Sequence, residues 1–390
     1  MRKWIASLSL GVAVAFAGQA ASAQSVKVGV MLTLSGPAAV LGQHARDGFN
    51  LGLKHLGGKL GGLNAELVVV DDELKPDVGV QKVQALLERD KVDVVVGVIF
   101  SNVMMAIAKP VFDAQVPLVS PNAGPSPLAG KACSPWFFNT AWQNDQNHEA
   151  MGKHAQDAGY KKVVLIAPNY QAGKDSMAGF KRHFKGEIVD EIFNQVNQLD
   201  FSAEIARIAS LKPDAVFAFE PGGMGVNFVK QYAQAGLAGK IPFLSAFTVD
   251  ETTLPATQDA AVGMIAGAHW APNLDNPVNK KFVADYEKEY GQVPSMYAAQ
   301  GYDAAQLVDA AIKANGGKVN DKTALRDAFR KASFTSIQGK PFKLNNNGYP
   351  IYDVYSVKAV KRADGKFATE VVSTVFTEYK DAYSKDCPLQ

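Results

Sequence analysis

The chain has 390 residues, and its 40 basic and 38 acidic side chains give a formal charge of +2. That length predicts two domains, each large enough to bury its own core. Charges of both signs are interspersed and no long basic run carries interleaved aromatic residues, so we do not expect nucleic acid as a partner. Beyond the first 23 residues no apolar stretch of about 18 residues occurs, so we expect no membrane-spanning segment there.

The first 23 residues have the order of a secretory leader. Met1-Arg2-Lys3 is basic, residues 4–17 are mostly apolar, and Ala21-Ser22-Ala23 is a small-residue cleavage site. We therefore expect cleavage at about Ala23 and a mature chain that works outside the cytoplasm. A nucleotide-driven enzyme is disfavoured there, because ATP and NAD are scarce.

The chain has two cysteines, Cys133 and Cys387. In an oxidising compartment an even pair predicts one disulfide, here between the C-terminus and the middle of the chain. Two free thiols are the alternative. Neither cysteine lies in a CxxC motif or a Cys/His cluster, so we expect no metal site.

Short apolar runs alternate with segments of helical periodicity, taken here in chain order. The runs predict strands at residues 26–31, 65–70, 92–98, 118–120, 162–167, 215–219 and 243–244. The periodic segments predict helices at residues 45–56, 80–89, 103–112, 147–158, 176–184, 201–211 and 226–235. Later come helices at 278–290, 298–315 and 322–332 and strands at 352–360 and 369–375. The series runs through two cycles that divide near Trp142, which predicts an α/β fold with two doubly wound lobes.

Ligands of open α/β sheets bind at the carboxyl ends of the strands, so the loops there are the candidate sites. The loop at residues 34–42 has neither GxGxxG nor GxxxxGK[ST], which argues against a nucleotide; its Leu41 can offer an apolar wall. Phe100-Ser101-Asn102 opens a predicted helix, whose free amides and Ser101 hydroxyl can bind a carboxylate. The alternative is that Ser101 or Asn102 only caps the helix N-terminus and binds no ligand. The loop with Asn122-Ala123-Gly124 ends the next strand and can approach the same anion.

No motif for catalysis is present. The chain has no GxSxG sequence, no Cys/His pair with a family signature, and no HExxH among its six histidines. Asp71-Asp72-Glu73 is better explained as a solvated loop than as a cation site. We therefore expect no enzymatic activity and no cofactor.

The strand-end loops resemble those of the leucine/isoleucine/valine-binding protein family, the extracytoplasmic solute-binding subunits of ABC importers, in an aromatic-acid-binding branch. The resemblance covers essentially the whole mature chain. It rests on Val28-Gly29-Val30 with Leu34-Ser35-Gly36-Pro37, Val119-Ser120-Pro121, residues 170–173, and Ala178-Gly179-Phe180-Lys181.

The resemblance implies the type I periplasmic-binding-protein fold, in which two Rossmann-like lobes are joined by three hinge crossovers and close on a ligand. The hinges would fall near residues 140–142, 269–271 and 349–353. The lobes would then be discontinuous, with residues 24–141 and 271–350 in lobe 1, and residues 142–270 and 351–390 in lobe 2.

The resemblance also implies ligand contacts. In amino-acid binders of this family, a serine at the position of Ser101, a backbone group at that of Asn122 and a threonine at that of Gly124 hold the ligand carboxylate. A glutamate from the second lobe neutralises the ligand ammonium, and our alignment places Phe247 at its position. If the alignment is slipped, Phe247 is an ordinary core residue and Asp250 or Glu251 is the ammonium partner.

A buried ammonium without a carboxylate partner is costly, whereas a phenyl ring favours an aromatic group. We therefore expect a carboxylate without an α-amino group, of the benzoate or phenylpropenoid type. Tyr170, Tyr297 and Leu41 would add apolar walls, and Glu220 or Gln171 would hydrogen-bond a ring hydroxyl. A branched-chain or other aliphatic amino acid is the alternative ligand, with amides, urea-like solutes and other organic acids behind it.

The resemblance implies a periplasmic location, a membrane permease as partner, and a monomeric chain. A ligand-sensing partner of a membrane receptor and a periplasmic hydrolase are the competing classes. The sensor role would require a separate receptor. The hydrolase role is disfavoured because the chain has neither a nucleophile motif nor a metal cluster.

Overall fold

The computed structural model describes residues 25–389. The predicted leader and its cleavage site lie outside the described residues. Within residues 25–389, no helix is both long enough and apolar enough to cross a membrane.

The first sheet has six strands in the order β2-β3-β1-β4-β5-β6, all parallel except the short β2. The central strand β4 consists of three valines and a glycine and every one of its residues is buried, which is the pattern of a strand covered on both faces. The strands are β1 (Ser25–Leu32), β2 (Lys59–Leu60), β3 (Leu63–Asp71), β4 (Val94–Gly97), β5 (Leu118–Ser120) and β6 (Phe137–Asn139).

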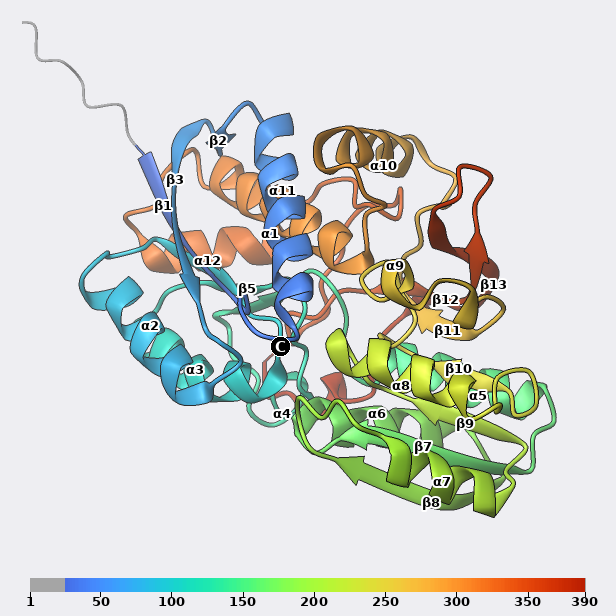
Figure 1. Ribbon diagram of the computed structural model, residues 1–390. Helices are drawn as coiled ribbons and strands as arrows, with labels where there is room; N and C mark the ends of the chain where they lie inside the picture. The colour runs from blue at the N-terminus through green and yellow to red at the C-terminus, as the bar shows by residue number, and fades with distance from the viewer. Residues whose placement is uncertain (1–24, 390) are drawn as a thin grey trace, which may run out of the picture.

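Helices from two distant parts of the chain cover this sheet. On one face α1 (Ala39–His55) lies beside α11 (Met296–Ala314) (Figure 1). A Cβ on Gly48 of α1 would lie 1.9 Å from the carbonyl oxygen of Ala298, so only glycine permits this approach. The same side holds α10 (Pro277–Tyr290) and α12 (Lys322–Lys331). The other face is covered by α2 (Pro76–Glu88) and α3 (Ser101–Asp113). The short helix α4 (Ser126–Ala129) follows β5.

The second sheet has seven strands in the order β13-β12-β11-β10-β9-β7-β8, with β12 and β13 antiparallel to their neighbours. The remaining pairs are parallel. The strands are β7 (Lys162–Pro168), β8 (Glu187–Asn194), β9 (Ala215–Ala218), β10 (Phe243–Ser245), β11 (Ile265–Ala268), β12 (Tyr352–Lys361) and β13 (Phe367–Tyr379).

The helices of this half pack in two layers. On one face α5 contacts α6, and Gly152 of α5 lies against the Phe180 carbonyl. On the other face α7 and α8 enclose a separate apolar cluster that includes Phe201 and Phe228. The helices are α5 (Gln146–Asp157), α6 (Gln171–His183), α7 (Ser202–Leu211), α8 (Gly223–Gln234) and α9 (Leu254–Thr257), with single 3₁₀ turns η1 (Gln258–Ala260) and η2 (Ser384–Asp386).

The chain crosses between the two halves three times: from β6 to α5, from β11 to α10, and from the segment after α12 to β12. The predicted fold class, two doubly wound lobes joined by three crossovers, is confirmed. The bounds of the predicted elements differ mostly at their ends, and α1 and α6 begin several residues earlier than predicted. The strands β2, β6, β8 and β11 and the short helices α4 and α9 were not predicted.

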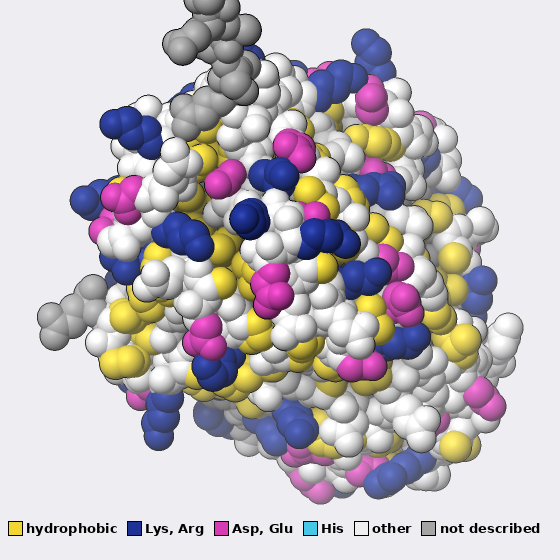
Figure 2. Space-filling model, turned by 90° about the vertical axis from the view of Figure 1, so that its left-hand side faces the viewer, with side chains coloured by type: hydrophobic (Ala, Val, Ile, Leu, Met, Phe, Trp, Pro, Cys, Tyr) yellow, Lys and Arg dark blue, Asp and Glu magenta, His cyan; other side chains and the backbone are white. Residues whose placement is uncertain are grey.

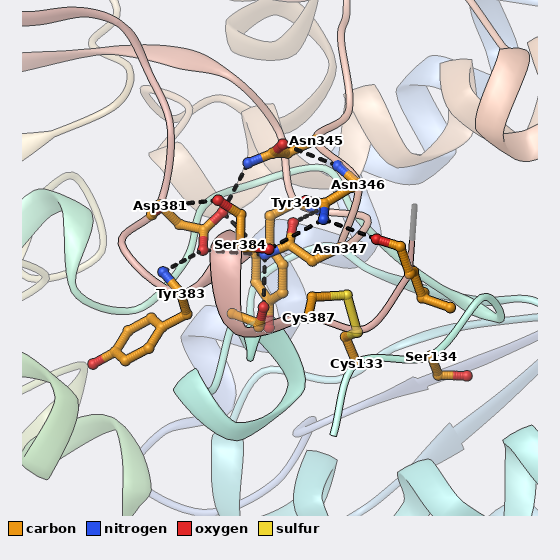
Figure 3. Close-up of a disulfide and its surroundings, with 12 residues drawn as sticks. Cys133, Ser134, Asn345, Asn346, Asn347, Tyr349, Asp381, Tyr383, Ser384 and Cys387 are labelled. Carbon is orange, nitrogen blue, oxygen red and sulfur yellow. Dashed lines mark hydrogen bonds between the residues drawn. A yellow bond between two sulfur atoms is a disulfide. The ribbon is translucent and has the colours of Figure 1, made fainter. Parts of the chain in front are cut away.

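The last residues return to the first half of the molecule. Cys387 is bonded to Cys133, which follows α4, with 5.7 Å between their Cα atoms (Figure 3). The Asn346 side chain also donates to the carbonyls of Ser384 and Leu389. The structure therefore has the predicted bridge, and it places the end of the chain against residues of the predicted lobe 1.

One face of the molecule shows how the charges are distributed. In Figure 2, Lys and Arg side chains are interspersed with Asp and Glu side chains, and no large area of one sign stands out on that face.

Candidate functional site

A small cavity lies between the two sheets. Its walls come from the carboxyl ends of strands of both sheets, from the first crossing segment, and from the start of α11, which is where an α/β fold positions a ligand. It is lined by Leu41, Ile99, Phe100, Ser101, Asn122, Trp142, Asn144, Tyr170, Ala172, Phe219, Pro221, Phe247 and Tyr297. These side chains are mostly aromatic or aliphatic, and none is ionised at neutral pH.

The polar part of the cavity is the start of α3. Ser101 is the first residue of this 13-residue helix, and its N-cap residue, Phe100, makes no side-chain cap hydrogen bond. The first amides of a helix carry partial positive charge and favour a bound anion. Asn144 donates from Nδ2 to Ser101 Oγ at 3.1 Å. Because that amide nitrogen only donates, the Ser101 hydroxyl proton is left for another acceptor.

The loop after β5 contributes less than the sequence predicted. Asn122 lines the cavity, and its Nδ2 is bound to the Ile99 carbonyl at 2.7 Å. The Ala123 amide donates to the Val98 carbonyl, and the Gly124 amide donates to Asn144 Oδ1 at 3.0 Å. Both amides are already used within the protein, and neither residue lines the cavity.

An aromatic cluster forms another part of the wall. The Phe247 ring lies 4.2 Å from the Trp142 ring, 5.9 Å from that of Tyr297 and 6.2 Å from that of Phe219, measured between centroids. The Tyr170 ring is nearly parallel to Phe219, at 6.2 Å. Burial raises the pKa of Tyr170 and of Tyr297 well above that of a free tyrosine, so both hydroxyls are neutral. Such a wall suits a flat aromatic group.

Phe247 has a strained backbone. Its φ is +58°, in the left-handed region that costs a residue with a Cβ about 1–2 kcal/mol. Strain of this kind concentrates at functional sites, where the surrounding structure holds it. Here it directs the ring into the cavity wall.

The nearby acidic side chains do not line the cavity. Asp250 Oδ1 accepts from the amide and hydroxyl of Thr252, and Glu251 Oε1 accepts from those of Thr369. Glu220 is fully buried and accepts from Asn194 Nδ2 at 3.2 Å. Burial raises the pKa of Asp250, that of Glu251 to about 7, and that of Glu220 well above its usual range. The cavity therefore offers an ammonium group no carboxylate on its walls.

The structure brings seven of the twelve predicted site residues to the cavity: Leu41, Phe100, Ser101, Asn122, Tyr170, Phe247 and Tyr297. The other five lie outside its lining: Asn102, Ala123, Gly124, Gln171 and Glu220. Gln171 instead donates to Asp175 and Ser126.

Six lining residues were not predicted: Ile99, Trp142, Asn144, Ala172, Phe219 and Pro221. Four of them adjoin predicted residues in the same loops. Trp142 and Asn144 belong to the first crossing segment. The family resemblance indicated residues 140–142 only as a hinge, and Asn144 lies beyond that range. Among residues 25–389, no group of three His, Cys, Asp or Glu side chains is placed to hold a metal ion.

Fold and cavity together define a class of protein in which two doubly wound α/β sheets face one enclosed cavity. The family model described as periplasmic binding protein matches residues 25–366. The chain therefore belongs to the periplasmic binding protein family.

Individual relatives align over almost the whole chain. It is 30% identical over 368 residues to the Leu/Ile/Val-binding protein homolog 6 of Brucella melitensis, covering 92% of this chain and 93% of that one. A solute-binding protein of an ABC transporter from R. palustris, solved in complex with benzoate, is 36% identical with a TM-score of 0.88, covering 94% of this chain and 100% of that one. One from Rhodopseudomonas palustris BisB5, in complex with 3,4-dihydroxybenzoic acid, is 32% identical with a TM-score of 0.86, covering 92% and 99%.

Proposed function

We propose that this chain is the periplasmic solute-binding subunit of an ABC importer and that it captures a small aromatic carboxylate of the benzoate or phenylpropenoid type. The observation that carries the proposal is the composition of the cavity: an aromatic wall around Phe247, a serine at a helix start, and no carboxylate on the walls. The two solved relatives with benzoate-type ligands support this ligand class.

In this proposal the ligand carboxylate binds at Ser101 and the first turn of α3, where the helix dipole and the hydroxyl favour an anion. The ring lies among Phe247, Trp142 and Tyr170. A ring hydroxyl would hydrogen-bond to a polar group behind these rings, and Glu220 remains a candidate for that role. The chain acts as a monomer without catalysis, and the lobes predicted from the sequence close around the ligand and present it to a permease.

An aliphatic amino acid is the second candidate ligand, since a curated relative is named as a Leu/Ile/Val-binding protein homolog. Such a ligand brings an ammonium group, and the cavity walls carry no acidic side chain to pair with it. An unpaired ammonium in a dry cavity costs several kcal/mol, which is why the aromatic acid is preferred.

Isothermal titration of the mature chain with benzoate, 4-hydroxybenzoate, cinnamate and leucine tests the proposal. We expect one aromatic acid to bind per chain, with leucine much weaker. Ser101→Ala should weaken binding of that acid about tenfold, because a hydrogen bond to a charged group is lost, and should leave the melting temperature nearly unchanged.

Asn102→Ala is the matched control. Asn102 is the next residue of the same helix and does not line the cavity, so its truncation should change the affinity less than twofold. Tight leucine binding without any response to aromatic acids would refute the proposed ligand class. Hydrolysis of a test ester that Ser101→Ala abolishes would refute the assignment as a binding protein.

A further inference from the structure

Asn144 occupies a central position beside the cavity that no sequence motif marked. It lies between β6 and α5, in the first segment that crosses between the sheets, and its side chain is almost fully buried. Each polar atom of its amide has a partner. Oδ1 accepts from the Gly124 amide at 3.0 Å, and Nδ2 donates to Ser101 Oγ at 3.1 Å and to Asp175 Oδ2 at 2.8 Å.

The contact with Ser101 fixes the direction of a proton. An amide nitrogen of asparagine is only a donor, so Ser101 Oγ must accept from it. Among the described residues, the Ser101 hydroxyl makes no other hydrogen bond. Its own proton is therefore free to point into the cavity, where a carboxylate would accept it.

The contact with Asp175 leads to the other half of the molecule. Asp175 lies on α6 and is buried, and its carboxylate accepts from the Ser126 amide at 3.0 Å and from the Ser126 hydroxyl at 2.7 Å. Ser126 begins α4, on the side of the first sheet, so this carboxylate joins the two halves beside the cavity. Gln171 adds a further donor to Asp175 from α6 itself.

We propose that Asn144 is a positioning residue that couples recognition of the anion at Ser101 to the closed arrangement of the two halves. Asp175 acts as the latch, by which we mean the side chain whose hydrogen bonds to Ser126 hold α4 and α6 together. One amide orients the serine toward the ligand and also satisfies the carboxylate that holds α4 to α6. This inference rests on the proposed function, because it requires a ligand carboxylate at Ser101.

A double-mutant cycle of Asn144→Ala and Ser101→Ala tests the positioning role, with titrations of benzoate and its neutral analogue benzamide. Ser101→Ala should weaken benzoate about tenfold or more and benzamide much less. Asn144→Ala should weaken benzoate at least as much, and it should weaken benzamide by a smaller factor because Asp175 also loses a donor. The double variant should be no weaker than the weaker single variant, because both substitutions remove one shared interaction. Losses that multiply, or an Asn144→Ala loss equal for benzoate and benzamide, would overturn the role.

Asn122→Ala is the control for truncating an asparagine of the same cavity. Its amide donates to the Ile99 carbonyl and not to Ser101. Combined with Ser101→Ala, its effect should multiply with the serine effect, unlike that of Asn144→Ala.

Asp175→Asn tests the latch. It should weaken benzoate and benzamide by the same factor, about tenfold, because it disfavours closure without touching the anion contact. Asp157→Asn, at an exposed site at the end of α5, should leave both affinities unchanged. Without any ligand, hydrogen exchange of the Ser126 amide should accelerate at least tenfold in Asp175→Asn, and an unchanged exchange rate would overturn the latch.

These experiments distinguish an error in the proposed ligand class from an error in the roles of Asn144 and Asp175. If the native chain binds leucine and no aromatic acid, the ligand class is wrong, and the same cycle with leucine and leucinamide judges the role of Asn144. The exchange measurement judges the latch whichever solute the chain binds.

Discussion

Phe247 combines a bulky buried ring with a backbone conformation that rarely carries one. Its neighbours hold the ring against Trp142 and Tyr297, so the strain of the backbone is balanced by contacts within the cavity wall. The ring therefore contributes to the shape of the site as well as to the stability of the fold.

Phe247→Leu tests this role. Leucine keeps a large apolar side chain and the same backbone strain, but it loses the stacking surface offered to an aromatic ligand. We expect benzoate affinity to fall about tenfold, from the loss of aromatic contacts worth roughly 0.5–1.5 kcal/mol each. Isothermal titration measures the change.

Phe217→Leu is the control for Phe247→Leu. Phe217 is a buried ring on β9 that packs on Phe180 and does not line the cavity. Its replacement should lower the free energy of unfolding by about 1 kcal/mol and leave the affinity unchanged. Equal losses of affinity in both variants would contradict a specific role for Phe247.

Ser101 could be placed from the sequence because it follows a recognisable apolar strand, at whose carboxyl end an α/β sheet binds its ligand. The loop of Phe247 also follows such a strand, and the family resemblance singled out Phe247 within it. Trp142 and Asn144 could not be placed, because the segment between β6 and α5 has no periodic pattern. Its contacts with Ser101 and Asp175 depend on how the two sheets face each other.

At the scale of elements, the composition of a strand explains why some strands were not predicted from the sequence. The strand β8 (Glu187–Asn194) is an edge strand of the second sheet, and four of its eight residues are polar or charged, so it lacks the long apolar run used to find buried strands. The strand β11 is four residues long, with two small residues and one glycine, so its pattern is weak. The long helix α11 was predicted nearly to its ends because its periodicity is sustained over five turns.

The segment that follows β13 is held in place by side-chain hydrogen bonds and a disulfide rather than by pairing in a sheet. Asn347 donates to the Asp381 carboxylate and to the Ala129 carbonyl, and the disulfide fastens Cys387 near α4 (Figure 3). The bridge closes a loop with a sequence separation of 254 residues. Bridges over loops this long restrict the unfolded chain strongly in the chain-entropy model.

The variant with both Cys133→Ser and Cys387→Ser should lose stability without losing affinity. We expect the free energy of unfolding to fall by about 2–4 kcal/mol and the melting temperature by about 5–10 °C. Benzoate affinity should stay within twofold, because neither cysteine lines the cavity. Calorimetry of both proteins, with the native one also measured after reduction, checks this. A native chain whose melting temperature ignores reductant would contradict it.

At the scale of the whole molecule, the two halves also touch near residues that line the cavity. The Gly223 amide at the start of α8 donates to the Pro37 carbonyl in the loop before α1, at 3.2 Å. Leu41 and Pro221, which line the cavity, lie close to this contact in the sequence. An enclosed ligand can enter only when the halves separate, so this contact belongs to the closed arrangement.

Gly223→Leu should therefore weaken binding by opposing closure. A Cβ at Gly223 would lie 2.9 Å from the Pro37 carbonyl oxygen and 3.1 Å from the Pro37 Cβ, so a leucine forces the loops apart. Overpacking of this kind costs about 1–3 kcal/mol, which lowers the population of the closed form and raises the apparent Kd about 10- to 100-fold.

Small-angle scattering and titration together check this prediction. The radius of gyration of the native chain should fall when benzoate is added, whereas that of Gly223→Leu should change less. Lys230→Leu adds the same side chain to an exposed position of α8 and should behave like the native chain. Because Gly223 is not among the residues that line the cavity, a large loss of affinity in Gly223→Leu alone would be attributed to impaired closure. Native affinity and native compaction in Gly223→Leu would instead mean that the ligand is held without the contact between Gly223 and Pro37.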